Sequence, residues 1–180
     1  MRKKDCTIGR CVKSKGRVIM AKCIRCGKKG LFLKINNFGL CSDCQNLADL
    51  KREVENRYYS GMEKLQADWS LLYNLKQYTG AKADLYISQC KQNIELYKKM
   101  CVIEKKYGDT SPPNVPAYTR LAMIYERRGE FDKSVAVCRE ALKNGVWGDG
   151  MQARFIRMIK KSGRAPTSEE IAFAEKFLNE

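Results

Sequence analysis

Hydrophobic residues recur every three or four positions along most of the chain after residue 44, which is the spacing of one helix face. The first stripe predicts one long helix over residues 46–80, ending near Gly80, because glycine often follows the last turn of a helix. Its members are Leu47, Leu50, Val54, Tyr58, Met62, Leu65, Trp69 and Leu72. Tyr58, Gly61 and Trp69 interrupt an aliphatic seam, so the stripe favours packing within the chain over a coiled-coil dimer.

A second stripe predicts a helix from about Ala81 to Tyr107. The residues on its apolar face are Ala83, Tyr86, Cys90, Ile94, Tyr97 and Cys101, and the two cysteines there are expected to be small core residues. The segment GDTSPPNVP then breaks the pattern. A new helix is expected at about Pro116, because proline is well tolerated in a first helical turn.

Residues 117–145, AYTRLAMIYERRGEFDKSVAVCREALKNG, predict two antiparallel helices that turn at Gly129. Small residues would let the helices approach, and larger ones would fill the space between them. The small set is Ala122, Ser134 and Ala141, and the large set is Leu121, Tyr125, Phe131 and Cys138. With Tyr118, these positions resemble a tetratricopeptide repeat. The departures are Tyr118 for the usual tryptophan, Cys138 at an aromatic position and Val146 for the terminal proline.

A single repeat cannot bury both of its faces, so the resemblance implies neighbouring hairpins. Residues 150–180 resemble a degenerate last repeat, with Phe155, Ile159 and Gly163 followed by a closing helix that carries Ile171, Ala174 and Phe177. Thr167 or Ser168 is expected to cap that helix, with Glu170 in a capping box. Upstream, residues 81–107 and a partner helix from 45–79 would complete two to three hairpins.

The N-terminal part carries different chemistry. Two Cys-x-x-Cys pairs, Cys23 with Cys26 and Cys41 with Cys44, lie fourteen residues apart in a chain that has no histidine. This spacing predicts a tetrahedral zinc site. Four protein ligands leave no open position, so one structural Zn²⁺ is expected.

The sequence around these pairs predicts a knuckle at Gly27, a strand or hairpin arm in GLFLKI, a turn in NNFG and a helix that starts beside Ser42 and Asp43. This order resembles a treble-clef zinc finger over about residues 21–55. Cys6 and Cys11 are more loosely spaced, and we expect an unliganded arm, with a second metal site as the alternative. A redox dithiol or free-thiol pairs are the other interpretations of the four cysteines, but no βαβ pattern surrounds them.

The formal net charge is +15, and residues 1–44 hold twelve basic residues against Asp5 and Asp43. Such a basic segment indicates either an anionic partner such as nucleic acid or an ordinary solvated surface. The candidate nucleic-acid contacts in the finger are Lys22, Arg25, Lys28, Lys29 and Lys34. Those in the arm are Arg2, Lys3, Lys4, Arg10, Lys13, Lys15 and Arg17.

Together these patterns predict a mostly α protein. Residues 1–20 are expected to form a basic arm, 21–45 a four-cysteine finger, 46–80 a long connecting helix and 81–180 a tetratricopeptide-like domain. We expect a non-enzymatic, cytoplasmic adaptor without a membrane segment, because there is no histidine, no phosphate loop and no long apolar run. Its carboxylates are expected to be solvated; they are Glu126, Glu130, Asp132, Glu140, Glu169 and Glu170.

The resemblance implies that the helical domain binds a protein or peptide, and Arg120, Arg127 and Arg128 are candidate contacts for an acidic peptide or ordinary surface charges. A nucleic-acid-binding protein and a thiol redox protein are the alternative functions. The sequence leaves the oligomeric state open.

Overall fold

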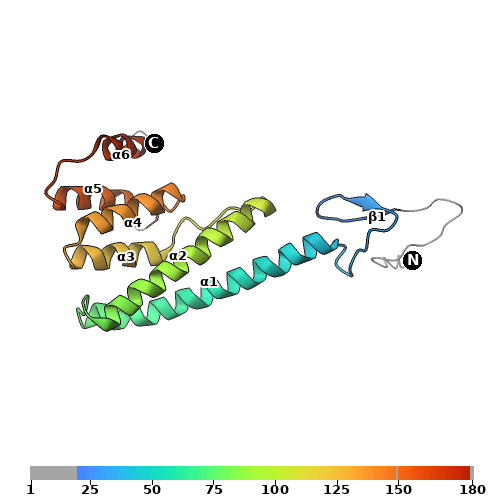
Figure 1. Cartoon of the computed structure of the whole chain (residues 1–180), viewed down its shortest axis with the longest axis horizontal. Coiled ribbons are helices and arrows are strands. Elements are labelled where there is room, and N and C mark those ends of the chain that lie inside the picture. Colours follow the sequence, from blue (N-terminus) through green and yellow to red (C-terminus); the bar gives the residue numbers. More distant parts are fainter. Residues whose placement is uncertain (1–19, 149, 179–180) are drawn as a thin grey trace, which may run out of the picture. The chain divides into compact units, whose positions relative to one another are not determined.

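The computed structural model describes residues 20–148 and 150–178, and the side chains through Lys176. Over this range the chain is mostly helical, as predicted, with a small antiparallel sheet (Figure 1). The elements are β1 (Ala21–Lys22), β2 (Lys29–Gly30), α1 (Ser42–Asn74), α2 (Ala81–Tyr107), α3 (Pro116–Arg127), α4 (Phe131–Lys143), α5 (Met151–Lys161) and α6 (Ser168–Leu178). The predictions for Cys6, Cys11, the basic arm and the side chain of Phe177 lie outside the described residues.

The chain divides into two compact units between Glu53 and Val54. The first unit contains β1, β2 and the beginning of α1. The second contains the rest of α1 and helices α2 to α6. Each unit has its own buried residues, which are described separately below.

In the second unit, α1 packs along α2 through the apolar stripe (Figure 1). Tyr58, Leu65 and Leu72 are buried there. Two cross-helix hydrogen bonds reinforce the contact. The hydroxyl of Tyr86 donates to the carbonyl of Leu65 at 3.1 Å, and the Asn93 amide donates to the carbonyl of Tyr58 at 2.9 Å. The expected packing of this stripe within the chain is therefore confirmed for Tyr58, Leu65 and Leu72, whereas Leu50, nearer the start of α1, is 47% exposed.

The end predicted for the first helix is wrong. Helix α1 stops at Asn74, and Gly80 precedes α2 instead of ending α1. Lys76 has a left-handed φ of 52°, and the amide of Gln77 donates to the carbonyl of Leu72 at 3.0 Å. This is a Schellman-type ending, in which glycine usually occupies the left-handed position. A lysine there carries no sequence signal.

Helices α3 and α4 form the predicted hairpin, and Gly129 turns the chain with a φ of 73°. Ser134 is fully buried, and its hydroxyl donates to the carbonyl of Ala122 at 2.9 Å. Cys138 is fully buried on the same helix. The small residues therefore lie at the helix contact, as the sequence pattern indicated.

Helices α5 and α6 follow, and the ring of Phe155 meets that of Phe173 at 5.6 Å. The capping box at the start of α6 is confirmed. The amide of Glu170 donates to the Thr167 hydroxyl oxygen at 3.2 Å, and the amide of Thr167 donates to the Glu170 carboxylate at 2.9 Å. Among the described residues, no helix combines the length and the apolar character that a membrane crossing would require.

Two carboxylates predicted to be solvated are instead largely shielded from solvent and paired with cations. Glu126 is 15% exposed and accepts from Arg154, Arg157 and Lys161 of α5. Glu170 is 5% exposed and pairs with Arg164 through both oxygens at 2.7 Å. A helix position alone does not reveal such partners, because they lie on other helices and loops.

Candidate metal centre

The first cysteine pair lies in a tight turn between β1 and β2. The amide of Cys23 donates to the carbonyl of Lys28 at 2.9 Å, and the amide of Gly27 donates to the carbonyl of Cys23 at 3.0 Å. Gly27 has a φ of 71°, which a glycine adopts without strain. The predicted knuckle is confirmed.

The strand predicted for GLFLKI is wrong in most of its length. The antiparallel pair is Ala21 with Gly30 and Lys22 with Lys29, so the hairpin flanks the knuckle. After Gly30 the chain turns, and only Ile35 returns to a bridge, with Cys41. An apolar run of this length does not by itself tell a strand from an exposed loop.

The turn predicted for NNFG is confirmed, and it brings the second cysteine pair into place. Gly39 has a φ of 74°, and its amide donates to the carbonyl of Asn36 at 3.0 Å. Cys41 follows in the bridge, and Cys44 lies in the first turn of α1. The amide of Cys41 donates to the sulfur of Cys23 at 3.4 Å, which links the two pairs directly.

The four sulfurs of Cys23, Cys26, Cys41 and Cys44 lie within 4.8 Å of one another. The Sγ atoms of Cys26 and Cys41 are 3.7 Å apart. In a tetrahedral site with Zn–S bonds of about 2.3 Å, the sulfurs are separated by about 3.8 Å. A disulfide would need about 2.05 Å. The cluster therefore fits one metal ion such as zinc, and the chemistry of four thiols suits that ion.

Burial limits the charge that the cluster can carry without a cation. Cys23, Cys41 and Cys44 are buried, and Cys26 is exposed. Three partly buried hydrophobic residues, Leu33, Ile35 and Leu40, pack against the buried cysteines. Thiolates in such surroundings need a compensating positive charge, because burying an unpaired anion is costly.

The surroundings shift the pKa values of two of the thiols in opposite directions. Backbone amides, first that of Cys26 and then that of Cys41, donate to Cys23 and lower its pKa. Burial raises the pKa of Cys44, and the neighbouring sulfurs raise it further. Outside the cluster, Lys28 pairs with Asp43 at 2.9 Å, and this carboxylate raises the lysine's pKa.

The other candidate residues fall into two groups. Lys22 and Lys29 lie opposite each other on the hairpin, while Arg25 is in the knuckle and Lys34 in the following loop. By contrast, Cys90 and Cys138 lie in the helical core, where burial raises the pKa of each thiol to about 12. These two are core residues, as expected, whereas Cys101, which was also predicted to be a core residue, is only partly buried.

The three arginines proposed for an acidic peptide contact their own chain. Arg120 donates to Gln66, Arg127 lies 5.8 Å from the ring centre of Tyr78, and Arg128 donates to the Tyr78 carbonyl and to Asp84. These contacts tie α3 to α1, to the loop between α1 and α2, and to the first turn of α2. They do not support a peptide site at these residues.

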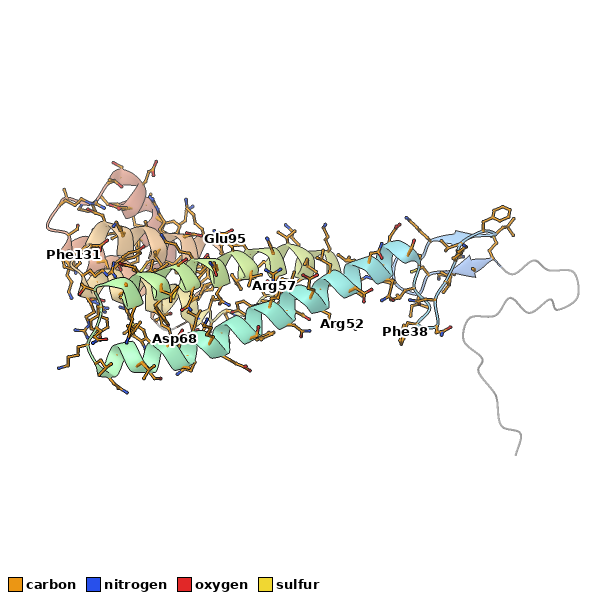
Figure 2. All side chains as sticks on the ribbon, turned by 60° about the horizontal axis from the view of Figure 1, so that its bottom comes forward. Phe38, Arg52, Arg57, Asp68, Glu95 and Phe131 are labelled. Atoms are coloured by element: carbon orange, nitrogen blue, oxygen red, sulfur yellow. The ribbon has the colours of Figure 1, made fainter. Side chains whose placement is uncertain are left out.

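Two exposed aromatic residues of the finger were not among the candidate site residues predicted from the sequence. Phe32 is 95% exposed and Phe38 is 74% exposed, and both lie in loops (Figure 2 labels Phe38). The available signal was their position in the GLFLKI and NNFG segments, outside any helical stripe. Comparisons with known protein families, with characterised proteins and with solved structures found no match for this chain.

Proposed function

We propose that this protein is a non-enzymatic adaptor, in which a four-cysteine finger holds one structural zinc ion and the helical unit binds a partner protein. The separation of 3.7 Å between Cys26 and Cys41 Sγ supports the zinc site. Four sulfurs would fill a tetrahedron and leave no position for water or substrate, which is the arrangement of a structural site.

The knuckle, the hairpin and a helix whose first turn carries Cys44 are the parts of a treble clef, and we assign the finger to that class. The α3–α4 hairpin, with Ser134 bonded across to Ala122, supports the assignment of a tetratricopeptide-like unit. In this interpretation, α1 with α2 and α5 with α6 are the neighbouring hairpins that a single repeat needs. Domains of this kind present helical surfaces to partner proteins in the cytoplasm.

The observation that carries the adaptor function is an apolar groove between α1 and α2. It encloses about 300 Å³, and three of its leucines are at least 60% exposed: Leu71, Leu75 and Leu85. Exposed apolar surface of this kind marks interaction sites more often than solvent-facing structure. One acidic and one basic residue, Asp68 and Lys82, line it as well (Figure 2 labels Asp68).

The occupant that fits this groove is an apolar segment of a partner protein with little net charge. The lining charges of Asp68 and Lys82 balance each other, so neither an acidic nor a basic peptide is favoured. The leucines would hold large aliphatic or aromatic side chains, as helix-binding grooves do.

Two measurements test the proposal. Native mass spectrometry of protein purified under reducing conditions without added zinc should find one zinc per chain, which is lost in Cys44→Ser. Peptides selected from a random library on the immobilised full-length protein should then be titrated against wild type, Leu85→Asp and Val102→Asp. The matched control uses Val102, which is 60% exposed on the same helix but outside the groove.

The selected peptides should bind Leu85→Asp at least tenfold more weakly than wild type, and they should bind Val102→Asp as tightly as wild type. Equal affinity for all three proteins would reject the groove. Protein that is free of zinc and carries disulfides between the cysteine pairs would reject the structural metal and favour a thiol redox protein.

A further inference from the structure

The finger exposes both large aromatic and basic side chains. Its interior is formed by the cysteines with Leu33, Ile35 and Leu40, so the rings of Phe32 and Phe38 are left outside. In a module of this size, two exposed phenylalanines are a substantial apolar surface, and such surface usually has a binding role.

The ring of Phe38 is carried on a firmly held turn. The Asn36 side-chain oxygen accepts from the amides of Phe38 at 3.0 Å and Leu40 at 2.9 Å. The amide of Ile24 in the knuckle donates to the Gly39 carbonyl at 3.0 Å. A turn fixed at both ends presents its ring with little entropy left to lose on binding.

Two lysines stand directly opposite each other on the hairpin. Lys22 pairs with Lys29 in the register of β1 and β2, so their side chains project from the same face. Like charges at opposed positions destabilise a strand pair. An anion bound between the two ammonium groups would remove that repulsion, and phosphate is the common biological anion of suitable size.

A single-stranded nucleic acid supplies a partner for both kinds of exposed side chain, and a flexible strand can reach them in succession. Its phosphates match the lysines, and its unpaired bases match exposed aromatic rings, on which they stack. The finger holds five basic residues and only Asp43 as an acid between residues 20 and 45. Even after the charge of −2 that a tetrathiolate zinc site carries, this part of the chain stays positive.

We propose that the finger binds single-stranded nucleic acid, with Phe32 and Phe38 stacking on bases and Lys22 with Lys29 holding a phosphate. This rests on the zinc-stabilised finger of the proposed function, and it is independent of the leucine groove. It names a second partner class for the same chain.

The test is fluorescence anisotropy of labelled dT12 and rU12 with the zinc-loaded full-length protein at graded salt. Phe32→Ala and Phe38→Ala should each weaken binding about fivefold or more, the effect of losing one stacked base. Val102→Ala, an exposed apolar change in α2, is the control and should leave binding unchanged. Residues 1–19 are identical in all these proteins, so their charge cannot produce the difference.

The charge variant tests the phosphate contact separately. Lys22→Gln with Lys29→Gln should reduce the slope of log K against log salt by about 0.7, the value for the loss of one phosphate contact on a single strand. The control pair, Lys99→Gln with Lys106→Gln on α2, should leave it unchanged. Both control lysines are exposed.

The proposal is overturned if zinc-loaded protein binds neither oligonucleotide at low salt, or if the phenylalanine variants bind as tightly as wild type. Binding to vesicles of phosphatidylcholine and phosphatidylglycerol that needs the rings, without oligonucleotide binding, would overturn it in favour of a membrane surface. Zinc content and peptide titration on the same samples keep these results separate from a failure of the adaptor function.

Discussion

Gly61→Ala should destabilise the helical unit, although alanine is the better helix former. Gly61 lies within α1, and a Cβ added there would lie 2.8 Å from the side-chain nitrogen of Asn93 on α2. That amide is at the end of a side chain and can move. However, movement would break its 2.9 Å hydrogen bond to the Tyr58 carbonyl.

The two opposing effects can be weighed. Replacing glycine by alanine in a helix interior contributes about 1 kcal/mol of stability. Asn93 is only 2% exposed, and its oxygen already has no hydrogen-bond partner among the described residues. Leaving its nitrogen unpaired as well costs about 1–3 kcal/mol. The net change is a destabilisation of about 1 kcal/mol.

The second substitution reverses the sign. In an Asn93→Ala background nothing opposes the new methyl group, so Gly61→Ala should stabilise by about 1 kcal/mol. The coupling energy between the two sites is then about 2 kcal/mol. Urea unfolding followed by circular dichroism at 222 nm measures all four proteins, with the exposed Ser60→Ala as a neighbouring control. An equal gain from Gly61→Ala in both backgrounds would refute the reasoning.

Three further outcomes are expected. In Cys41→Ser, proteolysis with mass spectrometry should find residues 21–45 unfolded, because metal binding supplies much of the folding free energy of such a module. The far-ultraviolet circular dichroism of the helical unit should stay largely intact. Loss of all helical signal in one step would contradict this expectation. Arg164 lowers the pKa of Glu170 to about 2 from its ordinary 4.5. This pair should therefore contribute stability above pH 4.5, and about 2 kcal/mol of it should be lost as the pH falls from 4.5 towards 2, after allowance for solvent screening at Arg164, whose side chain is 35% exposed. Acid unfolding of wild type and Glu170→Gln checks this, and equal acid sensitivity would contradict it. Cys90 and Cys138 should resist alkylation at pH 8 in the folded protein, because burial raises the pKa of both thiols to about 12; labelling at the rate of a free thiol would contradict this.

Much of the helical unit could be predicted from the sequence, because its apolar residues recur every three or four positions, which is the helical period. Tyr58, Leu65 and Leu72 are buried where the stripe put them. The end of α1 was not readable, since it depends on a left-handed Lys76. The partners of Glu126 lie about thirty residues away on α5, and charge pairing over that separation has no local signal.

In the finger, the metal spacing was readable and the strand positions were not. Cysteine pairs at this separation predict a cluster, and the four sulfurs do gather. The hairpin is only two residues long on each side, too short for alternation to be seen. The exposure of Phe32 could not be predicted either. An apolar run in a sequence suggests burial, but it does not show whether the fold provides a core to bury it in.

The two units differ in what can hold them folded, and this difference bears on their proposed roles. The helical unit buries several large aromatic side chains, among them Tyr86, Tyr118 and Phe155. The finger has a far smaller interior, made of cysteines and three partly buried aliphatic residues. Modules below about 40 residues usually need a metal or disulfides to fold. Zinc would therefore control the surface that carries Phe32 and Lys22, while the leucine groove would keep its shape without the metal. If both proposals hold, the chain would bind its protein partner independently of metal and nucleic acid only when zinc is bound.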